Sequence, residues 1–493
     1  MLRSAIVDVI TQQGIFRGAP TSSGWSFKGI PYAAAPIGEA RFAAPHPPEP
    51  HEGVADATEY GATVSTPPQR SAVMDALLPD PRRPGLNGLN LNVWTPDVMG
   101  QAPVLVFVHG GGFATGAGST TAFDGTAFAR DGVVAVTINY RLAAEGFGFF
   151  PDAVPNRGLL DIVAALEWVQ AEIAAFGGDP ARVTICGESA GAMAVCTLLA
   201  VPRAQGLFRR AISQSGTAHH VHTVERAQLV AAELAGELGT KPTAEAIAAV
   251  PEDRLHAASN VVMNRLTSGQ DPRFAGFTRL TFQPVVDGDI LPEHPFPAVA
   301  AGASSDVDLL IGANAEEYGL FVAPTGMWDK LTEDALRATT SRICPDPDAM
   351  IATYRSRRPG ASPAELFVAI QSDWFCVAPT ERLVAVRREG THAYQFAWRP
   401  STYDGRAGAC HTLEIPFVFD TLNDPWGIEL RGTDALQAVA DEMHAAWVAF
   451  VRDGDPGWPV HGVAGTVRRF GAPSEMVTDP WAEAREAWAG RDF

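Results

Sequence analysis

Four short runs of apolar residues constrain the fold of this 493-residue chain more than any other feature. They lack the alternation of polar and apolar positions, and they occupy residues 103–109, 133–139, 182–186 and 307–311. Strands of this kind are buried on both faces, as in a parallel sheet covered by helices. A helical pattern at roughly 158–175 separates the second run from the third, so we predict an α/β fold built from βαβ units.

The rest of the chain carries no linker, internal repeat or low-complexity tract that would divide it. We therefore predict one domain over residues 1–493, with a mostly parallel central sheet, helices on both faces and large helical insertions. The clearest additional helical patterns lie in 221–275 and 430–453.

A serine flanked by glycines, Gly187-Glu188-Ser189-Ala190-Gly191, follows the third apolar run and precedes a stretch that can form a helix. A sharp turn of this kind between a strand and a helix presents a nucleophilic serine in many hydrolases. The glycines are needed because a Cβ there would collide with neighbouring backbone. The short pattern is not specific by itself, so its context decides.

A glycine-rich segment, His109-Gly110-Gly111-Gly112-Phe113, directly follows the first apolar run. An acyl-transfer enzyme needs backbone N–H donors for the oxyanion of its tetrahedral intermediate. We predict that Gly111, Gly112 and Ala190 supply them. A phosphate-binding loop would also be rich in glycine, but this segment lacks the Gly-Lys-Ser/Thr ending of a P-loop.

The serine also needs a base, and the chain has twelve histidines. Enzymes with a serine turn of this kind usually carry serine, acid and histidine in that order along the chain. This order leaves the nine histidines that follow Ser189, and spacing alone does not choose among them.

Together these motifs resemble the type B carboxylesterases, the carboxylesterase/cholinesterase family, which have the α/β-hydrolase fold. The resemblance covers nearly the whole chain and follows one fixed order. Its segments are 27–33 (FKGIPYA), 91–96 (LNVWTP), 109–113 (HGGGF), 139–142 (NYRL), 176–180 (FGGDP), 187–191 (GESAG), 212–216 (ISQSG) and 284–288 (PVVDG).

The resemblance implies a catalytic triad of Ser189, His411 and an acid in the segment Asn314-Ala315-Glu316-Glu317. The family pattern favours Glu317 over Glu316 as the acid, although Tyr318 stands where the family usually has glycine. His411 precedes the family's Glu-Ile-Pro-Phe-Val-Phe run. Ser215 is expected near the acid as a hydrogen-bond donor.

The chain departs from the family before residue 91, where Leu86-Asn87-Gly88-Leu89 replaces the usual Glu-Asp-Cys-Leu. The early disulfide of secreted members is therefore expected to be absent. The missing glutamate would also leave Arg41 without its usual ion-pair partner.

The composition of the chain limits which partners the protein is expected to bind and in which cellular compartment it is expected to act. With a formal net charge of −19 and no basic run, the chain is not expected to bind nucleic acid. It shows neither a signal-peptide pattern nor an apolar run of membrane-spanning length, which predicts a cytoplasmic protein. The five cysteines are expected to be reduced and buried. The oligomeric state is not predicted.

The sequence therefore predicts a serine carboxylic-ester hydrolase that forms an acyl-enzyme on Ser189 and needs no metal or organic cofactor. An amidase, thioesterase or acyltransferase would use the same triad. The motifs are less consistent with a non-catalytic interaction protein of the same fold, a cysteine hydrolase that uses Cys410 or a nucleotide-binding protein.

The substrate itself is not predicted. Segments 60–85, 260–280, 321–330 and 365–378 are expected to supply the pocket. The main aromatic candidates for its wall are Phe113, Phe321 and Trp374. Further aromatic candidates are Phe274, Phe277 and Trp328.

Overall fold

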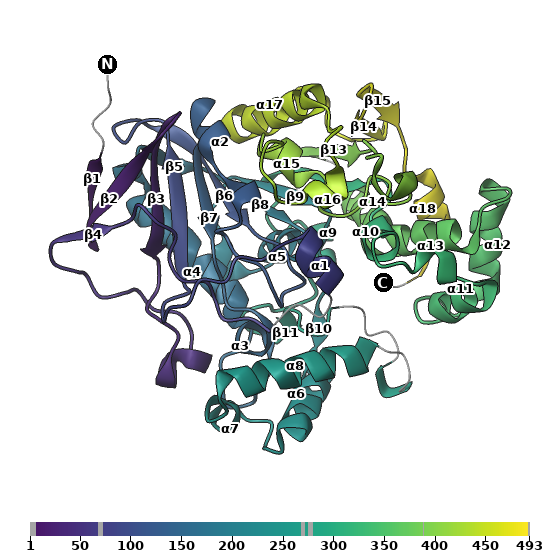
Figure 1. Ribbon diagram of the computed structural model, residues 1–493, viewed down its shortest axis with the longest axis horizontal. Coiled ribbons are helices and arrows are strands. Elements are labelled where there is room, and N and C mark those ends of the chain that lie inside the picture. The colour runs from purple at the N-terminus through teal and green to yellow at the C-terminus, as the bar shows by residue number, and fades with distance from the viewer. Residues whose placement is uncertain (1–5, 68–71, 268–271, 275–279, 388, 492–493) are drawn as a thin grey trace.

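The computed structural model describes residues 6–67, 72–267, 272–274, 280–387 and 389–491, and a large mixed sheet runs through it (Figure 1). Seven neighbouring strands are parallel. In spatial order they are β7 (Val134–Ile138), β6 (Ala102–Val108), β8 (Gly178–Glu188), β9 (Arg210–Gln214), β12 (Asp308–Asn314), β13 (Thr391–Phe396) and β14 (Thr466–Phe470).

Antiparallel strands extend both edges of this parallel core. They are β1 (Val7–Thr11), β2 (Gly14–Thr21), β3 (Gly24–Pro31) and β5 (Asn90–Thr95) at one edge and β15 (Glu475–Thr478) at the other. The short β4 (Val54–Asp56) pairs with β2, and β10 (His222–Thr223) pairs with β11 (Val285–Val286). The four apolar runs form β6, β7, β8 and β12, which confirms the predicted parallel core.

Helices cover both faces of the sheet, and strand β6 shows why its sequence does not alternate. Val104 and Val106 belong to a buried cluster that includes Leu159 of helix α4. Phe107 points to the opposite face, into a second cluster with Trp447 of helix α17. Because both sets are buried, every position of the strand is apolar.

Helices were expected on both faces of the sheet and in large insertions, and the structure has helices in both places. Those up to residue 300 are α1 (Ala72–Leu77), α2 (Thr126–Arg130), α3 (Ala143–Phe147), α4 (Arg157–Glu172), α5 (Ala190–Leu198), α6 (Val224–Leu238), α7 (Ala244–Ala248), α8 (Glu252–Thr267) and α9 (Pro295–Ala300). The later ones are α10 (Gly319–Val322), α11 (Glu333–Thr340), α12 (Pro347–Arg357), α13 (Pro363–Ser372), α14 (Ala378–Val386), α15 (Ile415–Val418), α16 (Ile428–Arg431), α17 (Gln437–Asp453) and α18 (Ala482–Ala487). Helices α6 to α8 lie at the bottom of Figure 1, and α11 to α13 lie at its right.

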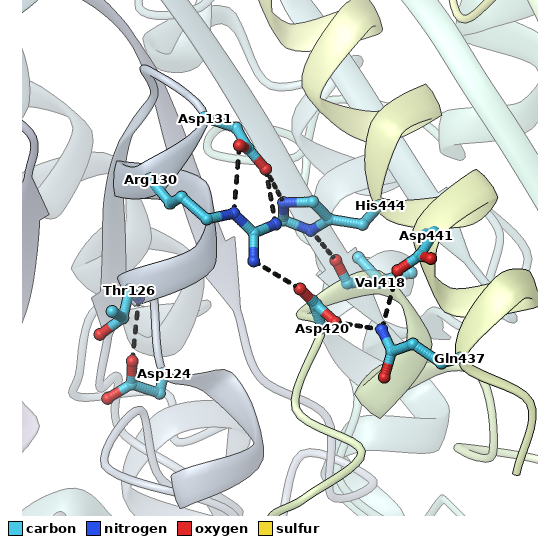
Figure 2. A network of polar contacts seen from close by, with 9 residues as sticks. All are labelled: Asp124, Thr126, Arg130, Asp131, Val418, Asp420, Gln437, Asp441 and His444. Atoms are coloured by element: carbon cyan, nitrogen blue, oxygen red, sulfur yellow. Dashed lines mark hydrogen bonds and ion pairs between the residues drawn. The ribbon is translucent and has the colours of Figure 1, made fainter. Parts of the chain in front are cut away.

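A polar network joins α2 to the segment that follows α15 and to α17 (Figure 2). Arg130 donates to Asp131 and to Asp420, each at 2.7 Å. His444 contacts Asp131 through Nε2 at 3.0 Å and the carbonyl oxygen of Val418 through Nδ1 at 2.7 Å. These contacts fix the end of α15, the helix that begins four residues after His411.

Arg41 forms an ion pair with a residue from another part of the chain in place of the missing glutamate. Its Nε donates to Glu145 Oε1 at 2.5 Å, and its Nη1 donates to the backbone carbonyls of Ala248 and Val250. Glu145 lies far from Arg41 in the sequence, so no local pattern before residue 91 could identify it.

The ion pair between Arg141 and Asp161 lies entirely in the core, with side-chain exposures of 1% and 0%. Asp161 accepts from Arg141 Nε, Nη2 and backbone N at 2.7–2.9 Å. Removing one partner leaves an uncompensated buried charge. We expect Asp161→Ala to lower the free energy of unfolding by about 3–5 kcal/mol in chemical denaturation.

The matched control is Asp8→Ala, which breaks an exposed pair with Arg17. It should leave the unfolding transition nearly unchanged, because solvent screens such pairs. Equal midpoints for the two variants would show that the buried pair does not stabilise the fold as described.

All five cysteines lie in the described part of the chain, and each is free and buried, as predicted. Among the described residues, no helix has both the length and the apolar character needed to span a membrane.

Candidate active site

Ser189 sits in a strained turn between β8 and α5, with φ 55° and ψ −123°. A Cβ on Gly191 would lie 2.0 Å from the carbonyl oxygen of Val108, and one on Gly187 would lie 2.4 Å from the carbonyl carbon of Gly191. Only glycine fits at either position. The turn is held further by a 2.9 Å hydrogen bond from Ser189 N to the carbonyl of Gln214.

His411 lies between Ser189 and Glu317. Its Nε2 is 2.7 Å from Ser189 Oγ, and its Nδ1 is 2.6 Å from Glu317 Oε2. Glu317 Oε1 accepts from the backbone N–H of Asn314 at 2.7 Å. A carboxylate only accepts, so Nδ1 carries a proton. In the neutral ring, Nε2 is then free to accept from the serine hydroxyl.

The three side chains come from loops that follow β8, β12 and β13. These strands are parallel, so their carboxyl ends meet at one edge of the sheet. The fold thus brings together residues 222 and 94 positions apart in the sequence.

Glu316 differs from Glu317 in that the contacts of its carboxylate do not include His411. Its carboxylate pairs with Arg399 and accepts from the backbone N–H of Ala409 at 2.8 Å. Cys410 belongs to the buried cluster that also contains Trp447 of helix α17. Its thiol is fully buried, and burial raises its pKa above the ordinary value.

Ser215 does not donate to Glu317, contrary to expectation. Its Oγ instead donates to Glu414 Oε1 at 3.4 Å, and Tyr394 donates to the same oxygen at 3.2 Å. Glu414 lies three residues after His411 and is fully buried. Burial and the charge of Glu317 raise the pKa of Glu414.

Glu188 is a further buried carboxylate that sequence reasoning did not assign to the site. Its Oε1 lies 3.6 Å from His411 Nε2. Burial raises the pKa of Glu188. Burial alone would lower the pKa of His411, but the charges of Glu188 and Glu317 outweigh burial and raise it.

Removing the charge of Glu188 should therefore shift the pH dependence of kcat/KM to lower pH. A carboxylate beside an imidazole favours the protonated ring, so Glu188→Gln lowers the pKa of His411. A histidine that acts as a base must be neutral, so the acidic limb of the kcat/KM profile should shift to lower pH by about one unit. Glu167→Gln, on the exposed side of α4, is the control. An unchanged limb, or a shift to higher pH, would contradict this electrostatic role.

The glycine loop after β6 packs directly against the serine. A Cβ on Gly110 would lie 3.0 Å from the Cβ of Ser189. Gly111 and Gly112 have φ of 110° and 65°, and a Cβ on Gly111 would lie 2.1 Å from the carbonyl oxygen of Thr115. Ala190 begins helix α5, so its N–H has no acceptor within that helix.

A cavity of about 610 Å³ opens above these residues. Its wall includes Gly111, Gly112, Ser189 and His411, and most of the remaining wall is apolar. All four predicted segments contribute to it. Examples are Leu78, Asp80, Met263, Phe321, Phe367 and Trp374.

Two of the three main aromatic candidates, Phe321 and Trp374, lie in the cavity wall. Phe113 does not, and assigning it to the pocket was wrong. With φ 59°, it turns its ring into the core against Phe147, with ring centroids 4.7 Å apart. Phe274 and Trp328 are not among the residues that line the cavity. Phe277 lies outside the described residues.

The comparison with known proteins agrees with this geometry. Residues 5–485 match the family model described as the carboxylesterase family. The chain belongs to the carboxylesterase family. Serine ester hydrolysis is the chemistry of this family, and the arrangement of Ser189, His411 and Glu317 is consistent with it.

Individual carboxylesterases resemble the chain over most of its length. The para-nitrobenzyl esterase of Bacillus subtilis is 36% identical over 477 residues, which cover 92% of each chain. The phenmedipham hydrolase of Pseudarthrobacter oxydans is 34% identical, covering 90% of each. A carboxylesterase crystal structure from Geobacillus stearothermophilus superposes with a TM-score of 0.85 at 35% identity, covering 98% of this chain and 100% of that one.

Proposed function

We propose that Ser189 is the nucleophile of this carboxylesterase, His411 its general base and Glu317 the acid that orients the imidazole. The observation that carries the proposal is the position of His411, with Nε2 2.7 Å from Ser189 Oγ and Nδ1 2.6 Å from Glu317. A serine is activated by an adjacent base that a third group orients.

In the first step, His411 takes the Ser189 proton as Oγ attacks the ester carbonyl. The N–H groups of Gly111, Gly112 and Ala190 receive the oxyanion, and the imidazolium returns its proton to the leaving alcohol. In the second step, His411 activates a water molecule that releases the acid from Ser189 and frees the enzyme.

The cavity favours apolar esters. Phe321, Phe375 and Trp374 form part of the wall beside the reacting atoms, and the rings of Phe321 and Phe375 lie 5.9 Å and 5.8 Å from that of His411. One relative is named a para-nitrobenzyl esterase, and the para-nitrobenzyl group carries an aromatic ring. We infer that this chain accepts aryl or aralkyl esters of uncharged acids.

Initial rates with p-nitrophenyl acetate, butyrate and octanoate test the proposal. We expect hydrolysis of all three and a KM that falls with chain length, because each buried CH₂ contributes about 0.8 kcal/mol. The matched p-nitroanilides should react far more slowly. Faster anilide hydrolysis would favour an amidase, and no turnover of any ester would contradict the proposal.

We also propose that residues 1–493 act as one catalytic domain in the cytoplasm. Support for the compartment comes from the five free, buried cysteines, since a reducing environment keeps thiols unpaired.

A further inference from the structure

A cysteine stands beside the proposed triad and has no part in its chemistry. Cys376 Sγ, one ring nitrogen of His411 and one carboxylate oxygen of Glu317 all lie within 4.8 Å of one another. The three side chains are buried, with Cys376 and Glu317 at 0% exposure. Among the described residues, this is the one group of three such side chains close enough to share a metal ion.

A widened helical turn brings the cysteine to this position. The π-helical turn η7 (Asp373–Val377) interrupts the continuous helix formed by α13 and α14. Such a turn shifts the residues it contains relative to an α-helix, and π turns are frequent at functional sites. Here Trp374 and Phe375 reach the cavity wall, and the Cys376 thiol donates to the carbonyl of Ser215 at 3.3 Å.

We propose that Glu317, Cys376 and His411 form an inhibitory binding site for a borderline or soft divalent cation such as Zn²⁺ or Cd²⁺. A thiolate sulfur, an imidazole nitrogen and a carboxylate oxygen are the ligands that Zn²⁺ takes in proteins. The thiolate favours Cd²⁺ further and disfavours hard cations such as Mg²⁺. This inference rests on the proposed role of His411 as the base.

The proton balance explains why a bound cation would inhibit. The nitrogen beside Glu317 is Nδ1, whose proton points to Oε2. A cation bound at Nδ1 requires the ring proton on Nε2, because a neutral imidazole carries one proton. The Cys376 thiol releases its proton to solvent. The complex of M²⁺ with one thiolate, one carboxylate and neutral imidazole is then uncharged, and one proton is released overall.

The cation thus reverses the tautomer that catalysis needs. Nε2–H would donate to Ser189 Oγ instead of accepting its proton, so the serine loses its base. The 2.6 Å contact between Nδ1 and Glu317 must also open for the cation to enter. Metal binding and an assembled triad are therefore mutually exclusive.

The first test measures inhibition of p-nitrophenyl butyrate hydrolysis by Zn²⁺, Cd²⁺ and Mg²⁺, with each rate divided by the metal-free rate of the same variant. For Cys376→Ala the half-inhibiting concentration of Cd²⁺ should rise more than about tenfold, since losing a ligand costs at least as much as losing an outer contact. For Cys376→Ser, which keeps the volume of the side chain, the half-inhibiting concentration of Cd²⁺ should rise similarly. The control Cys196→Ala removes another buried thiol, one that contacts Ser213, and should match the wild type.

The second test does not need activity. In Ser189→Ala, titration with Cd²⁺ should give the ultraviolet charge-transfer absorbance of a cadmium thiolate, with one equivalent bound. The double variant that also carries Cys376→Ala should lack this absorbance band. A wild-type protein without esterase activity, together with an intact band in Ser189→Ala, would count against the proposed function alone. No band, or equal inhibition of wild type and Cys376→Ala, would overturn the metal site.

Discussion

Replacing Ser189 with alanine should lower kcat/KM for p-nitrophenyl butyrate by about 10⁴- to 10⁶-fold. The variant loses the only oxygen that lies within hydrogen-bond distance of His411 Nε2 in the described structure. The residual rate would come from the oxyanion donors and from substrate binding. Steady-state kinetics at several enzyme concentrations measure the loss.

The matched control is Ser259→Ala in helix α8. Ser259 is fully buried and its Oγ has no hydrogen-bond partner in the described structure, so removing it should leave the rate unchanged. If Ser189→Ala instead kept a rate within tenfold of the wild type while remaining folded, another nucleophile would be at work.

Replacing Glu317 with glutamine should lower kcat by about 10³- to 10⁴-fold. Both carboxylate oxygens of Glu317 face donors, the N–H of Asn314 at 2.7 Å and Nδ1–H of His411 at 2.6 Å. An amide has only one oxygen, so its NH₂ group must face one of these donors. If it faces His411, the ring adopts the tautomer that cannot accept the serine proton.

The neighbouring Glu316→Gln provides a control of the same chemistry one residue away. Glu316 pairs with Arg399 and accepts from Ala409, and neither contact reaches His411. Its substitution should change kcat by no more than a few-fold. Equal losses of kcat in Glu316→Gln and Glu317→Gln would contradict the assignment of Glu317 as the acid of the triad.

The fold could be predicted well because its decisive signals are local. Residues buried on both faces of a strand must be apolar, and β6 satisfies this along its whole length with Val104 and Phe107 on opposite faces. The turn that carries Ser189 could be predicted equally well, because Gly187 and Gly191 have no room for a Cβ. Such constraints act within a few residues and therefore appear as short motifs.

The parts that could not be predicted depend on contacts between distant segments. Arg41 pairs with Glu145, and Cys376 approaches His411 only because a π-helical turn places it there. The family pattern suggested Ser215 as a partner of the acid, but its hydroxyl reaches Glu414. Phe113 has the right residue type and position for a pocket wall, yet its positive φ turns it into the core.

Covalent labelling tests the central claim most directly. The wild-type protein would be treated with one small organophosphonate, and its intact mass and peptide map compared with those of Ser189→Ala. The account predicts one phosphonyl group per chain, located on the peptide that contains Gly187-Glu188-Ser189-Ala190-Gly191, with activity lost in the same proportion. Stoichiometric inactivation with the label on any other residue would contradict it.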